Sequence, residues 1–193
     1  MAKVIGIAGS PRKNGNSTTL MKAVLAAAEA AGAETSIVYL NELTFRGCQG
    51  CDPCTPDLTC RVTDELTGVL KAVSAADGWV LAAPIYYDGV SGQMKLFFDR
   101  LRHLTNEAGD HHPMLPGRRA AAVIVTYEDK SRQDYFNVAR VLANYLAWMG
   151  DFAEVEILSA SRLGPADAAA GRADLLQEAG DIGGKLMDRL AEA

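Results

Sequence analysis

The stretch KVIGIAGSPRKNGNSTTL, from Lys3 to Leu20, decides the fold class of the chain. A short apolar run that ends at Gly9 is followed by a polar loop, after which an Ala- and Leu-rich helical pattern begins. This order predicts a strand, a loop and a helix. The N-terminus of a helix has unpaired N–H groups and a partial positive charge, so it favours anions. We therefore interpret the loop as a phosphate-binding loop; the alternative is an ordinary surface turn before a capped helix.

The residues that the loop lacks narrow the kind of phosphate. A nucleoside triphosphate loop of the G-x-x-x-x-G-K-[ST] type needs a lysine, whereas here Gly15 is followed by Asn16 and Ser17. The dinucleotide pattern G-x-G-x-x-G fails as well, because Gly6 and Gly9 do not have its spacing. The remaining donors are mostly neutral and suit a single monophosphate, such as that of FMN.

Composition and charge exclude several other classes of protein. The chain has 193 residues and a formal net charge of −5, which predicts one domain and gives no basic surface for nucleic acid. No apolar run approaches the roughly 20 residues of a membrane span. The N-terminus begins directly with a strand pattern rather than a signal peptide, so we expect a cytoplasmic protein that does not bind membranes. Cysteines in the cytoplasm stay reduced and are more often ligands or nucleophiles than disulfides.

Strand and helix patterns alternate along the whole chain, which predicts an α/β fold with a doubly wound parallel sheet and helices on both faces. The expected strands after the first cover 35–40, 79–84, 120–126 and 152–158. The expected helices cover 17–31, with Ser17 as the capping residue, a segment from residue 64, 91–105, 134–149 and 167–191. Ligands of such sheets bind beyond the carboxyl ends of the strands. The loops after residues 9, 40, 84 and 126 are therefore the candidate binding loops.

The segment PIYYDGVSGQMKLFFDR, residues 84–100, has two tyrosines and free backbone amides at the end of a buried strand. Aromatic rings can flank a planar ligand, although Tyr86 and Tyr87 could instead simply cover the end of the sheet. Ser91 is expected to cap the helix that follows. On that helix we place Arg100 on a solvated face, and we expect His103 at the surface.

Together, the two loops make the sequence similar to the flavodoxin-like NAD(P)H-dependent FMN reductase family. The motif G-S-P-R-x-x-G-N-[ST] matches residues 9–17, and P-x-Y-x-x-x-x-S-G-x-x-K-x-F-x-D-R matches residues 84–100. The resemblance implies one flavodoxin-like domain over 1–193, with five parallel strands in the order 2-1-3-4-5 and bound FMN. It assigns the phosphate of FMN to Ser10, Arg12, Asn16, Ser17 and Thr18. It assigns the flavin ring to Pro84, Ile85, Tyr86, Tyr87, Asp88 and Gly89, and to Thr126 and Tyr127 in a third loop that is charged where relatives often have glycines.

All four cysteines lie in GCQGCDPCTPDLTC, at Cys48, Cys51, Cys54 and Cys60, within a loop insert at about 45–62. Thiolates at this spacing can converge on one metal centre. The pattern resembles that of the iron-sulfur flavoproteins, which implies a 4Fe-4S cluster beside the FMN. A zinc site and a loop without metal remain alternatives.

The sequence thus predicts an oxidoreductase in which FMN and a cluster pass electrons, with no acid–base residue assigned. The expected donor is a ferredoxin or NAD(P)H, and the expected acceptor is a small molecule. The resemblance further implies a homodimer or homotetramer. The first alternative is an NAD(P)H-dependent reductase of FMN or quinone without a cluster. The second is a non-enzymatic module that binds zinc and docks a partner.

Overall fold

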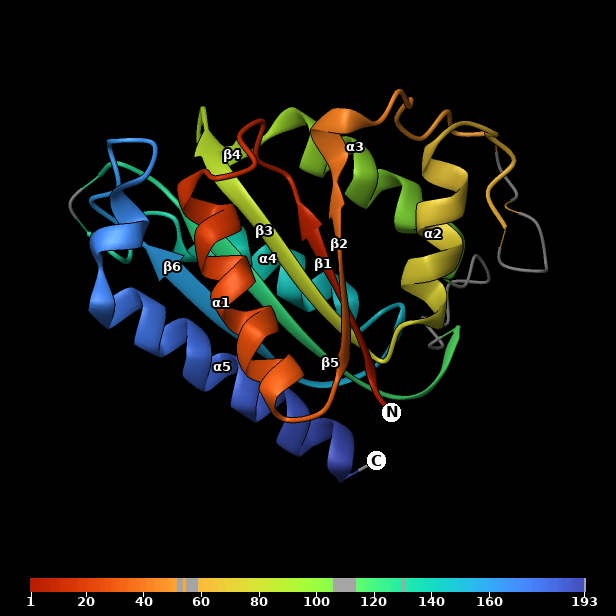
Figure 1. The fold of residues 1–193 in the computed structure, drawn as a ribbon. Coiled ribbons are helices and arrows are strands. Elements are labelled where there is room, and N and C mark those ends of the chain that lie inside the picture. Colours follow the sequence, from red (N-terminus) through yellow and green to blue (C-terminus); the bar gives the residue numbers. More distant parts are fainter. Residues whose placement is uncertain (52–53, 55–58, 106–113, 130, 193) are drawn as a thin grey trace.

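A central sheet of parallel strands organises the fold (Figure 1). The computed structural model describes residues 1–51, 54, 59–105, 114–129 and 131–192. The six strands of the sheet are β1 (Lys3–Ala8), β2 (Glu34–Tyr39), β3 (Gly78–Tyr86), β4 (Gly89–Val90), β5 (Leu115–Thr126) and β6 (Gly150–Ala160). Strand and loop patterns in the sequence therefore located each of the five long strands.

The order of the long strands is β2-β1-β3-β5-β6, and every pair among them is parallel. This confirms the flavodoxin-like order 2-1-3-4-5 for the parallel strands. The prediction of five strands in total is wrong, because the two-residue strand β4 pairs antiparallel with the end of β3. That pair is a short hairpin at the carboxyl edge of the sheet, where ligands of this fold class bind.

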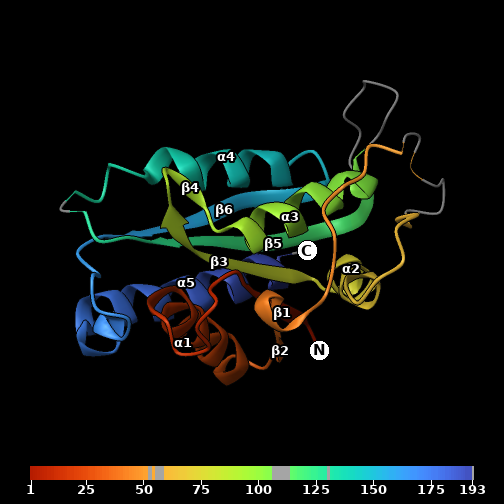
Figure 2. The ribbon, with the colours of Figure 1, turned by 90° about the horizontal axis from the view of Figure 1, so that it is seen from above.

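Helices cover both faces of the sheet (Figure 2). On one face lie α1 and α5, and on the other lie α2, α3 and α4 (Figures 1 and 2). Their bounds are α1 (Asn16–Ala30), α2 (Leu66–Ala75), α3 (Gly92–Arg100), α4 (Phe136–Leu146) and α5 (Ala173–Ala191), and three short 3-10 helices are η1 (Leu40–Glu42), η2 (Leu101–Leu104) and η3 (Ala168–Gly171). None of the helices in these described ranges is both long and apolar enough to cross a bilayer.

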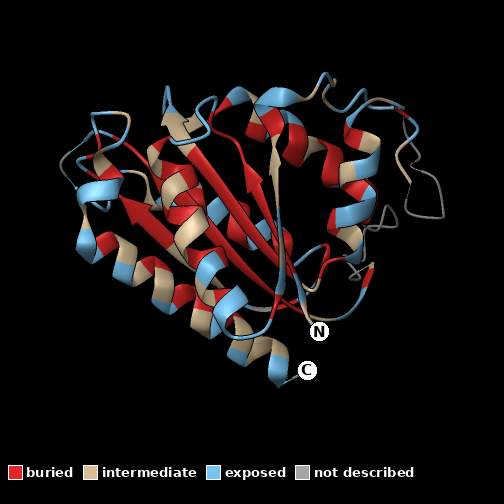
Figure 3. Ribbon diagram, in the orientation of Figure 1, coloured by how far each residue is buried: buried red, intermediate tan, exposed pale blue. Residues whose placement is uncertain are grey.

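The two helical layers enclose two apolar cores, one on each face of the sheet. The middle strands are buried almost throughout, as expected for parallel strands covered on both sides (Figure 3). Trp79 on β3 lies in the core below α2, α3 and α4, with its ring edge-to-face against Phe152 at 4.9 Å. The helices α1 and α5 approach closely, since a Cβ on Gly183 would meet the Ala27 Cβ at 2.7 Å. These buried layers hold the loops at the carboxyl edge of the sheet in fixed positions.

Candidate functional site

The loop between β1 and α1 is fixed by its own hydrogen bonds. The N–H of Gly9 donates to the carbonyl of Ala82 on β3 at 2.8 Å, and the N–H of Gly15 donates to the Arg12 carbonyl at 3.0 Å. The N–H of Arg12 donates to Ser10 Oγ at 3.1 Å. A Cβ on Gly15 would meet Ser10 Oγ at 2.8 Å, so the turn is packed too tightly there for a side chain. The loop is a preformed cradle before the first turn of α1.

The first turn of α1 contains a buried hydroxyl with no partner. The helix begins at Asn16 with Gly15 as the N-cap residue, so the expectation that Ser17 caps the helix is wrong. Ser17 instead lies inside the first turn, where it is 1% exposed. Its Oγ has no hydrogen-bond partner in the described part of the chain. Because an unpaired buried hydroxyl costs free energy, this atom indicates an oxygen-rich ligand at the helix N-terminus.

The other residues assigned to the phosphate lie around the same turn. Ser10 is buried, Arg12 is exposed, and Thr18 Oγ1 lies 3.4 Å from the Arg12 carbonyl to which it donates. The side chain of Asn16 has a different role. Its amide donates to the carbonyls of Leu163 at 2.9 Å and Pro165 at 2.8 Å. Its oxygen accepts from the N–H of Ala169 at 2.9 Å. These three bonds tie the loop to the segment before α5.

The β3–β4 hairpin lies at the same edge of the sheet. Its two turn residues, Tyr87 and Asp88, have φ angles of +47° and +60°, as a two-residue type I′ turn requires. Tyr87 is fully exposed and Tyr86 is 46% exposed. The hydroxyl of Tyr135 donates to Asp88 Oδ1 at 2.9 Å, and this bond raises the pKa of Tyr135 to about 12. The hairpin therefore exposes two tyrosine side chains to solvent. Its turn is held by the hydrogen bond from Tyr135, which precedes α4.

The remaining ring-binding candidates differ in exposure. Pro84 and Ile85 are half-buried and Gly89 lies in β4, whereas Thr126 and Tyr127 are buried. The Tyr127 hydroxyl donates to the Ser131 carbonyl at 3.0 Å and lies 2.8 Å from Ser159 Oγ. Its side chain is therefore part of the core.

The four cysteines line one hollow beside α3 and η2. Cys48 and Cys51 are exposed, Cys54 and Cys60 are half-buried, and the four form no disulfide with one another. The residues between them at 52–53 and 55–58 lie outside the described residues. Among the residues that the structure describes, no three His, Cys, Asp or Glu side chains are already arranged to hold a metal ion. Four cysteines around one hollow are suitable ligands for a thiolate-bound metal centre. In the described residues, however, their sulfur atoms are not yet arranged around a single point, as metal binding would require.

Arg100 lies at the base of this hollow, and placing it on a solvated face is wrong. It is 1% exposed, and each of its five N–H groups has an acceptor. Nε donates to Cys60 Sγ at 3.1 Å. The other four N–H groups donate to the carbonyls of Arg46 and Val62, each at 2.8 Å, and to the Asp64 carboxylate at 2.8 and 3.3 Å. Burial disfavours the cation, but the hydrogen bonds and negative charges of Asp64 and Cys60 together outweigh it, so the pKa of Arg100 is raised.

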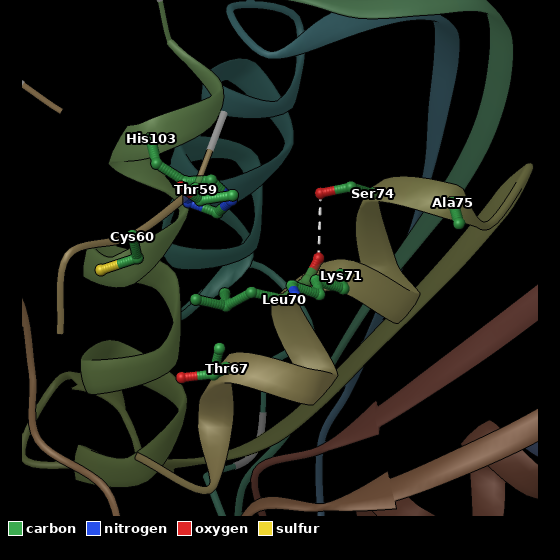
Figure 4. Close-up of a pocket in the computed structure, with 8 residues that line it drawn as sticks. All are labelled: Thr59, Cys60, Thr67, Leu70, Lys71, Ser74, Ala75 and His103. Carbon is green, nitrogen blue, oxygen red and sulfur yellow. Dashed lines mark hydrogen bonds between the residues drawn. The ribbon is translucent and has the colours of Figure 1, made fainter. Parts of the chain in front are cut away.

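A cavity of about 320 Å³ adjoins the thiol hollow, and Figure 4 shows the side chains around it. Cys60 and His103 border both spaces. His103 is 4% exposed, so the expectation of a surface residue is wrong. Burial lowers the pKa of His103, and its Nδ1 lies 2.8 Å from the Arg100 carbonyl, to which a neutral ring donates. The other lining residues are Thr59, Thr67, Leu70, Lys71, Ser74 and Ala75.

Sequence comparison places the chain in a family. The model of the NADPH-dependent FMN reductases matches residues 2–167. The chain belongs to this family of oxidoreductases. Among curated relatives it is similar to an iron-sulfur flavoprotein of Methanocaldococcus jannaschii, with 41% identity over 102 residues that cover 53% of each protein. An iron-sulfur flavoprotein of Archaeoglobus fulgidus is 33% identical over 123 residues, which are 64% of this chain and 54% of the relative. The chain thus spans about half the length of the curated relatives that it matches.

Solved structures confirm the fold of this family member. RosB with a bound riboflavin phosphate intermediate has a TM-score of 0.75 at 16% identity, over 100% of this chain and 81% of that one. An NAD(P)H:quinone oxidoreductase from Methanothermobacter marburgensis has a TM-score of 0.68 at 17% identity, over 100% and 98%. At these identities the likeness concerns the fold alone.

Proposed function

We propose that the chain is an FMN-binding redox protein whose phosphate site is the N-terminus of α1. The observation that carries the proposal is the buried Ser17 hydroxyl, which has no partner among the described residues although it lies at a helix start. Family membership supports FMN as the ligand. A phosphate oxygen at this position would accept from Ser17 and from the first N–H groups of the helix, which have no acceptor within the helix.

The flavin ring would extend from this phosphate toward the β3–β4 hairpin. The backbone from Pro84 to Gly89 would bond the polar edge of the ring, and Tyr86 or Tyr87 would cover one of its faces. The hydrogen bond from Tyr135 to Asp88 holds this turn in place. The backbone of Thr126 and Tyr127 would border the ring on the opposite side of β3, since β5 pairs with β3 there.

The cysteine loop would hold a 4Fe-4S cluster through Cys48, Cys51, Cys54 and Cys60. Two facts support this assignment: the four thiols line one hollow, and the curated relatives at 31–41% identity are iron-sulfur flavoproteins. When bound, FMN exchanges one or two electrons and the cluster exchanges one at a time. The protein's own part is to bind both groups, to orient them and to keep water from the flavin.

The family description supports NADPH as the electron donor, with a ferredoxin as the alternative, and a small molecule as the acceptor. We further propose that the protein works in the cytoplasm as a homodimer or homotetramer in which the cysteine loop lies near a neighbour's flavin. Size measurement of the purified protein by light scattering tests the assembly directly. A monomer at working concentration would exclude the intersubunit arrangement.

Titration of flavin-free protein with FMN tests the phosphate site. Ser17→Ala removes one donor to a charged group, so we expect FMN to bind about tenfold more weakly, which corresponds to about 1.4 kcal/mol. The metal- and flavin-free variant should be as stable as the wild type or more so, because an unpaired buried hydroxyl is gone. Ser74→Ala is the matched control, since its hydroxyl donates to the Leu70 carbonyl at 2.9 Å on a distant helix. That control should lose stability and keep its FMN affinity. Unchanged FMN binding in Ser17→Ala would contradict the proposed site.

The second candidate is an NADPH-dependent reductase of FMN or quinone that uses no cluster. The match to the NADPH-dependent FMN reductase family supports it. Anaerobic reduction of bound flavin by NADPH separates the two candidates. If Cys54→Ala reduces both flavin and acceptor as fast as the wild type, the second candidate is correct.

A further inference from the structure

Arg100 joins two parts of the chain that flank all four cysteines. The carbonyl of Arg46 precedes Cys48, and the carbonyl of Val62 follows Cys60; both accept from the same guanidinium at 2.8 Å. The segment that carries the thiols is therefore closed at its base by one side chain.

The chemistry of this contact goes beyond loop closure. Burying a guanidinium is expensive unless it is paired and fully hydrogen-bonded. Asp64 supplies one negative charge, and this carboxylate also accepts from the N–H of Arg46 at 3.1 Å and that of Leu66 at 3.1 Å. The Nε–H is left over from this fork and points at Cys60 Sγ at 3.1 Å. Apolar or neutral side chains could also have held the two ends of the loop together. They would not have placed a positive charge against the Cys60 sulfur, as Arg100 does.

We propose that Arg100 is the positioning residue of the metal centre, which closes the cysteine loop before metal binds and fixes Cys60 as its first ligand. The inference rests on the proposed cluster and names the group that tunes it. A loop whose ends are already joined loses less conformational entropy when its thiolates assemble around metal. An N–H donor and a positive charge at a ligand sulfur stabilise the reduced, more negative centre, and so raise its reduction potential.

Two substitutions separate these effects. Arg100→Gln removes the charge and most of the fork, whereas Arg100→Lys keeps the charge but cannot reach both loop ends and Asp64 in the same geometry. The control is Lys95→Gln, which removes an exposed cation from the same helix. Far-UV circular dichroism and FMN binding show whether each variant has folded. If Arg100→Gln does not fold, Arg100→Lys and Asp64→Asn take its place.

The readouts are iron retention against a chelator, the midpoint potential of the cluster, and proteolysis of metal-free protein between residues 46 and 62. For Arg100→Gln we expect iron to be held about 10- to 100-fold more weakly, because a hydrogen-bond donor to the ligand sulfur of Cys60 is lost, and the loop to be cut about tenfold faster. The reduction equilibrium should shift about tenfold toward the oxidised form, which is about 59 mV for one electron. Arg100→Lys should keep a midpoint potential close to that of the wild type, because the positive charge remains, and its loop should be cut faster than that of the wild type.

The outcomes distinguish this inference from the proposed function. A wild-type protein that binds no iron would refute the cluster, and proteolysis of the loop would then still decide whether Arg100 closes it. If the wild type binds iron and Arg100→Gln matches it and Lys95→Gln in retention, potential and proteolysis, the role of Arg100 is refuted.

Discussion

The phosphate loop and the cysteine loop are built in opposite ways. The phosphate loop is held by its backbone N–H groups: that of Gly9 donates to a carbonyl of β3, and those of Arg12 and Gly15 donate to acceptors within the loop. The cysteine loop is held at its ends by Arg100 and Asp64, while Cys48 and Cys51 are exposed between them. In the proposed function, the first site would therefore be formed before FMN binds, whereas the second would need its metal to draw the thiols together.

One helix contacts both loops. At the start of α3 the Ser91 hydroxyl donates to the Gly9 carbonyl at 2.6 Å. Ser91 is the N-cap residue of α3, but its hydroxyl bonds the phosphate loop and not the helix. At the end of α3 lies Arg100. Between them Leu96 packs against the beginning of the cysteine loop, since a Cβ on Gly47 would meet Leu96 Cδ2 at 2.6 Å. The helix α3 is therefore the rigid part that fixes the two loops relative to each other.

The largest expected effect is a loss of metal from the cysteine loop while FMN binding is unchanged. Cys51→Ser should lose nearly all of its iron, because each thiolate is one of four ligands, and it should bind FMN as the wild type does. Metal analysis and FMN titration of the same anaerobic preparation measure both. Ser17→Ala should show the reverse pattern, with full iron and weakened FMN. Joint loss of both cofactors in Cys51→Ser would refute the separation of the two loops.

The next effect concerns how the phosphate loop is tied to the rest of the chain. Asn16→Ala removes three hydrogen bonds to the segment before α5, so we expect a loss of about 2 kcal/mol in the free energy of unfolding. Urea denaturation measures it. Asn14→Ala is the control, because within the described residues the Asn14 side chain accepts one hydrogen bond, from the exposed ammonium of Lys22 at 3.1 Å. Equal stability of the two variants would contradict the account of the loop.

A smaller effect tests α3 as the link between the loops. In Gly9→Ala the new Cβ would lie 2.8 Å from the Cβ of Met94 and 3.1 Å from Ser91 Oγ, so α3 must shift. Overpacking of this kind costs about 1–3 kcal/mol, and here it should weaken the binding of both FMN and iron. Gly92→Ala is the matched control, since its Cβ meets nothing within 4 Å. If Gly9→Ala weakens FMN alone, α3 does not couple the loops.

The smallest effect concerns the hairpin that would border the flavin ring. The bond to Asp88 holds the pKa of Tyr135 at about 12, above its ordinary value of 10.0. The contribution of this bond to stability is present below pH 10 and is lost as the pH rises through 12. Tyr135→Phe should therefore remove the highest-pH step from the tyrosinate absorbance titration. Loss of a step near the ordinary value instead would show that the bond is not formed in solution.

The sequence was sufficient for the sheet order but not for its smallest strand. Apolar strand runs that alternate with helical patterns predicted a parallel sheet covered on both faces, whereas the order of its long strands came from the resemblance to the flavodoxin-like family. The β4 strand has two residues, too few for any periodic pattern. It forms because Tyr87 and Asp88 adopt left-handed angles, and neither residue type signals such a turn as strongly as Asn-Gly would.

The two candidate sites also differ in how far they could be predicted from the sequence. The phosphate loop is local in sequence, so its residues could be named from one motif, although not that Asn16 would bond to residues 163–169. Arg100 and His103 looked like surface residues because helical periodicity shows only one apolar stripe. Their burial comes from the cysteine-loop flanks packing over α3, a long-range contact between residues 36 to 54 positions apart for Arg100. The available sequence signal for a special role of Arg100 was its place in the second family motif, which ends in Asp-Arg.

The proposed pair of FMN and cluster is tested by anaerobic purification, followed by flavin, iron, sulfide and zinc analysis of one preparation. We expect one FMN with about four iron and four sulfide ions for each chain, and a broad absorbance band near 400 nm in addition to the flavin peaks. A yellow protein with FMN but no iron would refute the cluster, and a colourless protein that holds zinc and no flavin would contradict the account as a whole.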